Sequence, residues 1–114
     1  MTRDTGFVAE RDLQIARHFV ERLKEEIRPH IFDITLYGSR ARGDAEQESD
    51  LDLFVALKVD DPEEMIKQTA RRIACDLTLE YGILVSAFVA DRQFLQQHQG
   101  YALLEAVEEE GIPL

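Results

Sequence analysis

A Gly-Ser pair between two strand-like runs constrains the fold of this chain more than any other feature. The run before it, residues 31–37, is rich in β-branched and aromatic residues and predicts a strand. After Gly38 and Ser39 we expect one helical turn over 40–43, a polar loop over 45–49 and a second strand over 51–59. Asp50 and Asp52 lie where that strand begins. Because side chains alternate along a strand, the two carboxylates share a face.

This arrangement indicates nucleotide chemistry. Two carboxylates on one face repel each other unless a cation lies between them, and hard divalent cations prefer such oxygen ligands. A Gly-Ser turn that leads into a helical turn presents backbone N–H groups that suit a phosphate. Taken alone, Gly38 and Ser39 could be a plain turn capped by the serine, and Asp50 and Asp52 a solvated strand edge. The spacing of the two motifs favours a joint site.

The remaining sequence predicts an α+β fold. Helical periodicity covers 8–28, with Asp4 or Thr5 as its cap, and a second helix starts at 60–62 and ends near 81–82. A third strand is expected over 83–90, followed by a short helix over 91–99 and a last helix over 101–110 that Gly111 closes. We expect residues 1–114 to form one domain, a small mixed sheet of about three strands with helices packed on one face. The opposite face leaves Asp50 and Asp52 accessible.

Composition narrows the class of partner. The formal net charge is −10, from 23 acidic and 13 basic residues, which weighs against general nucleic-acid binding. The longest apolar run, 83–90, is too short to cross a membrane, and residues 1–10 show no signal-peptide pattern. The single cysteine, Cys75, fits a small buried apolar residue of a helix. A cytoplasmic protein that handles a small nucleotide is the expectation.

Gly38-Ser39 followed, after ten residues, by Asp50-x-Asp52 resembles the minimal nucleotidyltransferases, the smallest members of the DNA polymerase β-like superfamily. The resemblance extends to residues 40–43 and 49–53, and to the C-terminal pattern Leu104-x-x-Val107-x-x-Glu110-Gly111-Ile112. It implies the palm-like nucleotidyltransferase fold. Both motifs at this spacing, each beside a predicted strand, make a specific signal.

The resemblance implies transfer of a nucleoside monophosphate, with AMP expected, from a nucleoside triphosphate such as ATP to an acceptor hydroxyl. Gly38 and Ser39 would hold the triphosphate. Asp50 and Asp52 would be the catalytic residues and would bind Mg²⁺ or Mn²⁺. Arg40 and Arg42 could add positive charge beside the outer phosphates, or could be surface arginines paired with acidic neighbours.

One position departs from the family pattern. The family has a third aspartate on the next strand, and here Ser86 stands at the expected place. A serine hydroxyl is a weak neutral ligand and no general base at neutral pH. An alternative is therefore a catalytically weak or inactive module that binds nucleotide or docks on a partner.

The resemblance also suggests who supplies the acceptor. Short members of this family act as antitoxins beside a helical partner of the HEPN type, and some attach AMP to that partner. We therefore expect either such a helical partner or a homodimer.

Overall fold

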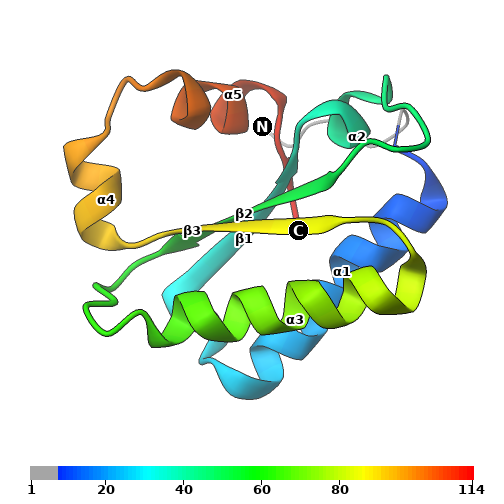
Figure 1. Ribbon diagram of the computed structural model, residues 1–114. Coiled ribbons are helices and arrows are strands. Elements are labelled where there is room, and N and C mark those ends of the chain that lie inside the picture. The colour runs from blue at the N-terminus through cyan, green and yellow to red at the C-terminus, as the bar shows by residue number, and fades with distance from the viewer. Residues whose placement is uncertain (1–7) are drawn as a thin grey trace.

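The computed structural model describes residues 8–114 and contains a four-stranded mixed sheet (Figure 1). Its strands are β1 (Phe32–Tyr37), β2 (Leu51–Leu57), β3 (Val85–Ala90) and β4 (Ile112–Pro113), in the spatial order β3-β2-β1-β4. Strand β1 runs antiparallel to β2 and β4, whereas β2 and β3 are parallel. The α+β prediction is confirmed. The predicted caps Asp4 and Thr5 lie outside the described residues.

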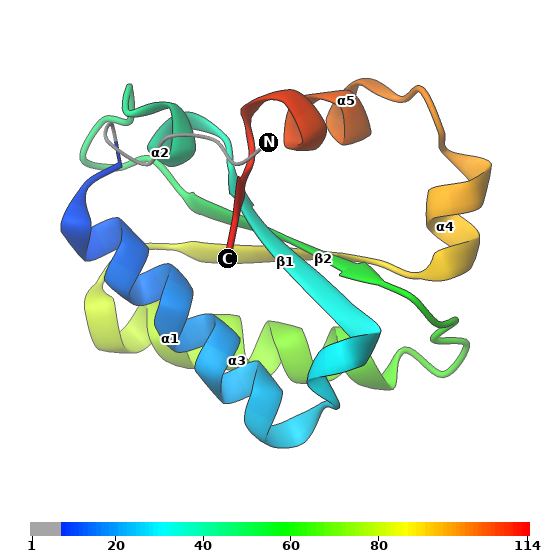
Figure 2. The ribbon, with the colours of Figure 1, turned by 180° about the vertical axis from the view of Figure 1, so that it is seen from behind.

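Two long helices cover one face of the sheet. Helices α1 (Glu10–Glu26) and α3 (Met65–Tyr81) lie side by side on that face in both views (Figures 1 and 2). Every second residue of β2 points toward them and is almost fully buried: Leu51, Leu53, Val55 and Leu57. The core therefore lies between the two helices and one face of the sheet, and Asp52 faces away from it.

The prediction that helices pack on one face holds only for the long ones. The short elements are the 3₁₀ turn η1 (Pro29–Ile31), α2 (Ser39–Arg42), α4 (Arg92–Gln97) and α5 (Ala102–Glu110). Helices α4 and α5 lie on the side opposite α1 and α3 (Figure 1). The side chain of Asp91 begins α4 by accepting a hydrogen bond of 2.8 Å from the backbone N–H of Phe94. The face that carries Asp52 is thus bordered by short helices.

Three sequence expectations were wrong in detail. Helix α3 begins at Met65 because Glu64 is left-handed (φ 55°) and Asp61 accepts hydrogen bonds from the N–H groups of Ile66 and Lys67. Cys75 is exposed, not buried, because it lies on the side of α3 that faces away from the core. Strand β4 was not expected.

Strand β4 could not be predicted from the sequence pattern, because it is only two residues long and one of the two is proline. It pairs with Leu36 and Thr35 of β1.

Within residues 8–114, no helix combines the length and apolarity needed to span a membrane.

Candidate functional site

The strand register brings two of the singled-out positions, Asp52 and Ser86, into one row with Tyr37. Tyr37 of β1 pairs with Asp52 of β2, and Asp52 pairs in turn with Ser86 of β3. Because register partners point to the same face of a sheet, all three side chains lie on the face away from α1 and α3. The next row on this face is apolar: the rings of Phe54 and Phe88 stack with their centroids 5.7 Å apart.

Gly38 lies directly against Asp52. Its backbone has φ 80° and ψ −162°, a conformation that is essentially restricted to glycine. A Cβ at this position would be only 2.5 Å from Oδ2 of Asp52. The glycine therefore allows the turn at the end of β1 to approach the carboxylate, and it links the two sequence motifs physically.

The turn after Gly38 forms the short helix α2. The carbonyl of Gly38 accepts hydrogen bonds of 3.1 Å from the N–H groups of both Ala41 and Arg42. Gly43 ends the helix in the left-handed conformation, and its N–H donates to the carbonyl of Ser39. The N–H groups at the start of such a helix have no intrahelical partner. Ser39 thus stands at the end of the turn that is nearest Asp52.

The two carboxylates differ in exposure. Asp50 is exposed just before β2, and Asp52 is half-buried within it. Burial raises the pKa of Asp52, and the charge of Asp50 raises it further, while Arg42 lowers it. Burial of Tyr37 raises the pKa of its hydroxyl, and the charge of Asp52 raises it further. A pair of mutually repelling oxygen ligands of this kind fits Mg²⁺ or Mn²⁺.

Arg40 is built into the structure behind the site. It is only 8% exposed, and its Nη1 donates to both carboxylate oxygens of Asp12 of α1, at 3.1 and 3.2 Å. Asp12 is itself 4% exposed. The other nitrogens of Arg40 donate to the carbonyls of Ser49 (2.9 Å) and Gln47 (3.2 Å). The guanidinium therefore ties α1 to the loop that leads into Asp50, and it does not face the row of Asp52.

Arg42 lies on the exposed side of the same turn. Its Nη1 donates to Glu110 of α5 at 2.9 Å, and its Nε donates to Asp44 at 3.3 Å. These hydrogen bonds, that with Glu110 first, raise the pKa of the guanidinium. Arg42 is also the cation whose charge acts on Asp52. Of the two arginines, only Arg42 is placed to act on an anion at the carboxylates.

A serine occupies the position expected for the third acidic residue of the site. Ser86 is exposed and pairs with Asp52, which agrees with the place that the family pattern assigns to the third aspartate. Asp91 is engaged in capping α4, and Glu80 lies 3.8 Å from His18 on the helical side of the sheet, so neither replaces the missing carboxylate. In the part of the chain that the structure describes, no three His, Cys, Asp or Glu side chains are grouped to hold a metal. Any ion at this site has two carboxylate residues to bind.

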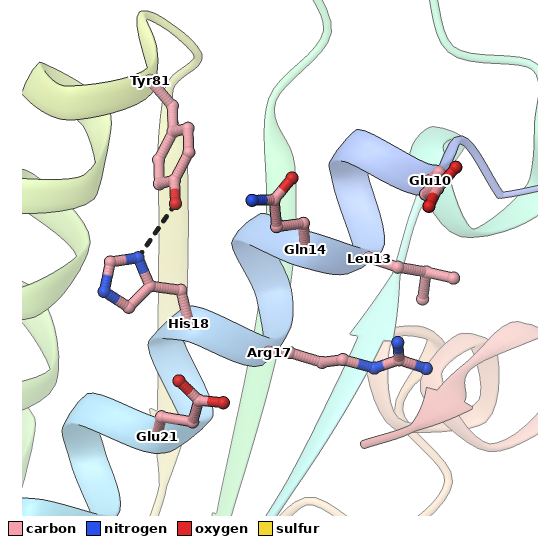
Figure 3. A pocket seen from close by; sticks show the side chains of 7 residues that line it. All are labelled: Glu10, Leu13, Gln14, Arg17, His18, Glu21 and Tyr81. Atoms are coloured by element: carbon pink, nitrogen blue, oxygen red, sulfur yellow. Dashed lines mark hydrogen bonds between the residues drawn. The ribbon is translucent and has the colours of Figure 1, made fainter.

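A hollow of about 530 Å³ lies elsewhere, along the outer side of α1 (Figure 3). It is lined by Glu10, Leu13, Gln14, Arg17, His18, Glu21 and Tyr81. His18 and the hydroxyl of Tyr81 are 3.0 Å apart and hydrogen-bonded, and the charged groups of Arg17 and Glu21 point apart. Its side chains do not converge on a common point (Figure 3), and it lies on the helical side of the sheet, opposite the face that carries Asp52.

Comparisons with known proteins bear on the fold and the family. Residues 16–110 match the nucleotidyltransferase domain family. A relative from Methanocaldococcus jannaschii, named as a putative protein adenylyltransferase, is 32% identical over 95 residues, which cover 83% of this chain and 89% of the relative. A solved structure described as a putative minimal nucleotidyltransferase superposes on this chain with a TM-score of 0.53 at 27% sequence identity. The superposition covers 93% of this chain and 99% of the other.

A toxin–antitoxin structure, the MntA-HpeT pair, supplies a further fold neighbour. It superposes with a TM-score of 0.56 at 17% identity, covering 86% of this chain and 70% of the other. At this identity the likeness concerns the fold. Together, these findings confirm the fold and the family expected from the Gly-Ser and Asp-x-Asp motifs.

Proposed function

From the premise that this chain belongs to the nucleotidyltransferase domain family, we propose that it transfers AMP from ATP to a hydroxyl of a partner protein. The approach of Gly38 to Asp52 is the observation that carries the proposal. It places a turn suited to phosphate against a carboxylate suited to a divalent cation, in a space too small for a side chain. The adenylyltransferase name of the archaeal relative supports AMP as the transferred group.

In this proposal, Asp50 and Asp52 hold Mg²⁺ or Mn²⁺, and Gly38 and Ser39 hold the triphosphate. A bound divalent cation supplies charge neutralisation at the phosphate oxygens and orients the nucleotide. Arg42 leaves Glu110 or Asp44 to contact the outer phosphates, as a guanidinium does with phosphate oxygens. Arg40 holds the loop that carries Asp50, and we assign it no nucleotide contact.

The proposed acceptor lies on another chain. The MntA-HpeT neighbour, a toxin–antitoxin pair, supports a toxin as the proposed partner, with this chain as the antitoxin. The helical, HEPN-type architecture of that partner is what the family resemblance implies. Since Ser86 offers no carboxylate to activate a hydroxyl, the acceptor would rely on its own surroundings for that step.

Transfer of label tests the proposal. The protein is incubated with each of the four α-labelled nucleoside triphosphates and Mg²⁺ or Mn²⁺, alone and with host lysate. We expect a labelled protein band with ATP that disappears in Asp50→Asn and Asp52→Asn. A band of equal intensity in both variants would contradict the role of the carboxylates.

A second function is favoured by one observation, the serine opposite Asp52. A module that binds nucleotide or a partner without transfer would need no third carboxylate. It predicts nucleotide binding without label transfer, and partner neutralisation that survives Asp50→Asn. Ser86→Asp separates the two functions further, because it would create transfer in an inactive module, whereas it would only modify the rate of an existing enzyme.

A further inference from the structure

The two edges of the sheet differ in how they are protected. The β4 edge is two residues long and ends in Pro113, which has no N–H to offer, and both features discourage strand addition. The β3 edge is six residues long and lies at the end of the strand order. In Figure 1, β3 runs across the front of the molecule, and no described helix or strand lies before it. It is an open edge of the kind that pairs with another strand.

The backbone groups available on this edge can be identified. The carbonyl of Leu84 accepts from Leu51 of β2, so the odd-numbered residues that alternate with it direct their N–H and C=O groups outward. The outward N–H of Val85 is already used, since it donates to Oγ1 of Thr78 at 2.9 Å. Within residues 8–114, no strand or side chain is hydrogen-bonded to the outward backbone groups of Ala87 and Val89. The backbone N–H and C=O groups of Ala87 and Val89 are therefore available to pair with another strand.

The edge carries no charge. Residues 83–90 contain none of the 36 charged residues of the chain, given by 13 basic plus 23 acidic. Natural edge strands usually carry a charge that prevents self-pairing. Exposed apolar side chains border the edge, with Leu84 55% and Phe88 37% exposed. A hollow of about 410 Å³ beside it is lined by Arg71, Ala74, Cys75, Thr78 and residues 84–87.

These observations select the occupant. A chain of net charge −10 approaches its own copy favourably only where it carries no charge, because a two-fold contact places like residues together. A basic partner would gain most on the acidic surface, and a helical partner has no free backbone groups to pair with Ala87 and Val89. We propose that β3 pairs antiparallel with β3 of a second copy of this chain.

The free groups also fix the register. Pairing Ala87 with Val89 of the second copy, and the reverse, uses all four outward groups and leaves the Val85 N–H on Thr78. The two-fold axis then passes between the two Phe88 residues, which form a non-hydrogen-bonded pair with Cα atoms about 4.5 Å apart. The two sheets join into one of eight strands, and both Asp50/Asp52 sites lie on the same face.

Light scattering coupled to size exclusion tests the assembly with the full chain. We expect twice the monomer mass, a dimer that strengthens as salt is raised because charge repulsion is screened, and dissociation in Ala87→Pro. Proline removes only an outward N–H, which an edge strand tolerates, so circular dichroism should stay unchanged. Tyr101→Lys, a charge at an exposed aromatic residue outside β3, is the control and should remain dimeric.

Cross-linking tests the register independently of proline. In a Cys75→Ser background, Phe88→Cys should form an intermolecular disulfide on mild oxidation, because the two Cα atoms lie within disulfide range. Ser86→Cys should not, since the two Ser86 residues are about 13 Å apart along the strands. A monomer at all salt concentrations, a dimer that survives Ala87→Pro, or equal cross-linking of both cysteine variants would overturn the proposal. Label transfer is measured separately, so failure of the dimer leaves the proposed activity distinguishable.

Discussion

Arg40 and Arg42 stand two residues apart in the same helical turn and have opposite surroundings. Arg40 is buried against Asp12 and two loop carbonyls, whereas Arg42 lies at the surface between Glu110 and Asp44. Successive side chains of a helix are rotated by about 100°, so residues two apart point in nearly opposite directions. Arg40 therefore faces the body of the protein, and Arg42 faces the site. The same residue type thus serves stability at one position and, in our proposal, substrate binding at the other.

The largest effect is expected from Arg40→Met. It leaves the Asp12 carboxylate buried without its cation and removes donors from the carbonyls of Ser49 and Gln47. Breaking a buried ion pair on one side costs about 3–5 kcal/mol of unfolding free energy. Urea unfolding measures the loss, and the double variant Asp12→Leu/Arg40→Met should recover most of it. Equal stability of Arg40→Met and wild type would contradict the structural role.

Gly38→Ala comes next and tests the turn that carries both arginines. The substitution meets strain from φ 80° and a clash of 2.5 Å with Oδ2 of Asp52, which we expect to cost about 1–3 kcal/mol. Gly82→Ala is the matched control, because Gly82 has φ 72° with nothing within 4 Å of the added carbon. Both variants should lose stability in urea, and only Gly38→Ala should also lose metal binding and transfer. Loss of transfer in both would assign the effect to general destabilisation.

The local parts of the site could be predicted from sequence, and its long-range parts could not. The Gly-Ser turn and the face of β2 that carries Asp52 follow from local sequence patterns, and the place of Ser86 follows from the family pattern. That Asp50 shares the face of Asp52 stays a prediction. The burial of Arg40 depends on Asp12, which lies 28 residues earlier on α1, and no local pattern indicates that pairing. Tyr37 entered the site only through its register with Asp52.

The missed structural elements have the same cause. Strand β4 exists because Ile112 and Pro113 lie beside β1, with Gly111 allowing a close approach to Thr35, and not because the two residues prefer an extended form. The start of α3 shifts to Met65 because the Asp61 carboxylate caps it from a distance of several residues. These features depend on contacts between residues that are distant in the sequence, whereas the two long helices follow from their apolar periodicity.

Arg42→Gln should produce the inverse of the Arg40 result. Its ion pairs with Glu110 and Asp44 are at the surface, so the unfolding free energy should change by less than about 0.5 kcal/mol. Loss of one charged contact to a phosphate should weaken nucleotide binding about tenfold. Titration of a fluorescent ATP analogue measures this. Glu110→Gln frees the guanidinium and should leave binding equal or tighter, and weaker binding in Glu110→Gln would contradict the proposed exchange of partners.

The smallest effect concerns Asp52, the carboxylate on which Arg42 acts. Burial and then Asp50 raise its folded-state pKa above the ordinary value of 3.8, so the metal-free folded protein holds that proton more tightly than the unfolded chain does. Ionisation of Asp52 therefore lowers the stability of the folded protein as the pH rises from 3.8 through the folded-state pKa, and the penalty is complete above the folded-state pKa.

Asp52→Asn removes the penalty. In EDTA, the variant should be slightly more stable than wild type at pH 7, and the difference should shrink as the pH falls through the folded-state pKa and disappear below pH 3.8. Added Mg²⁺ should reverse the order, because only wild type binds the ion through this residue. A variant that is less stable than wild type at pH 7 in EDTA would mean that the Asp52 carboxylate is held by favourable contacts, and the ion would then not be needed to relieve its repulsion with Asp50.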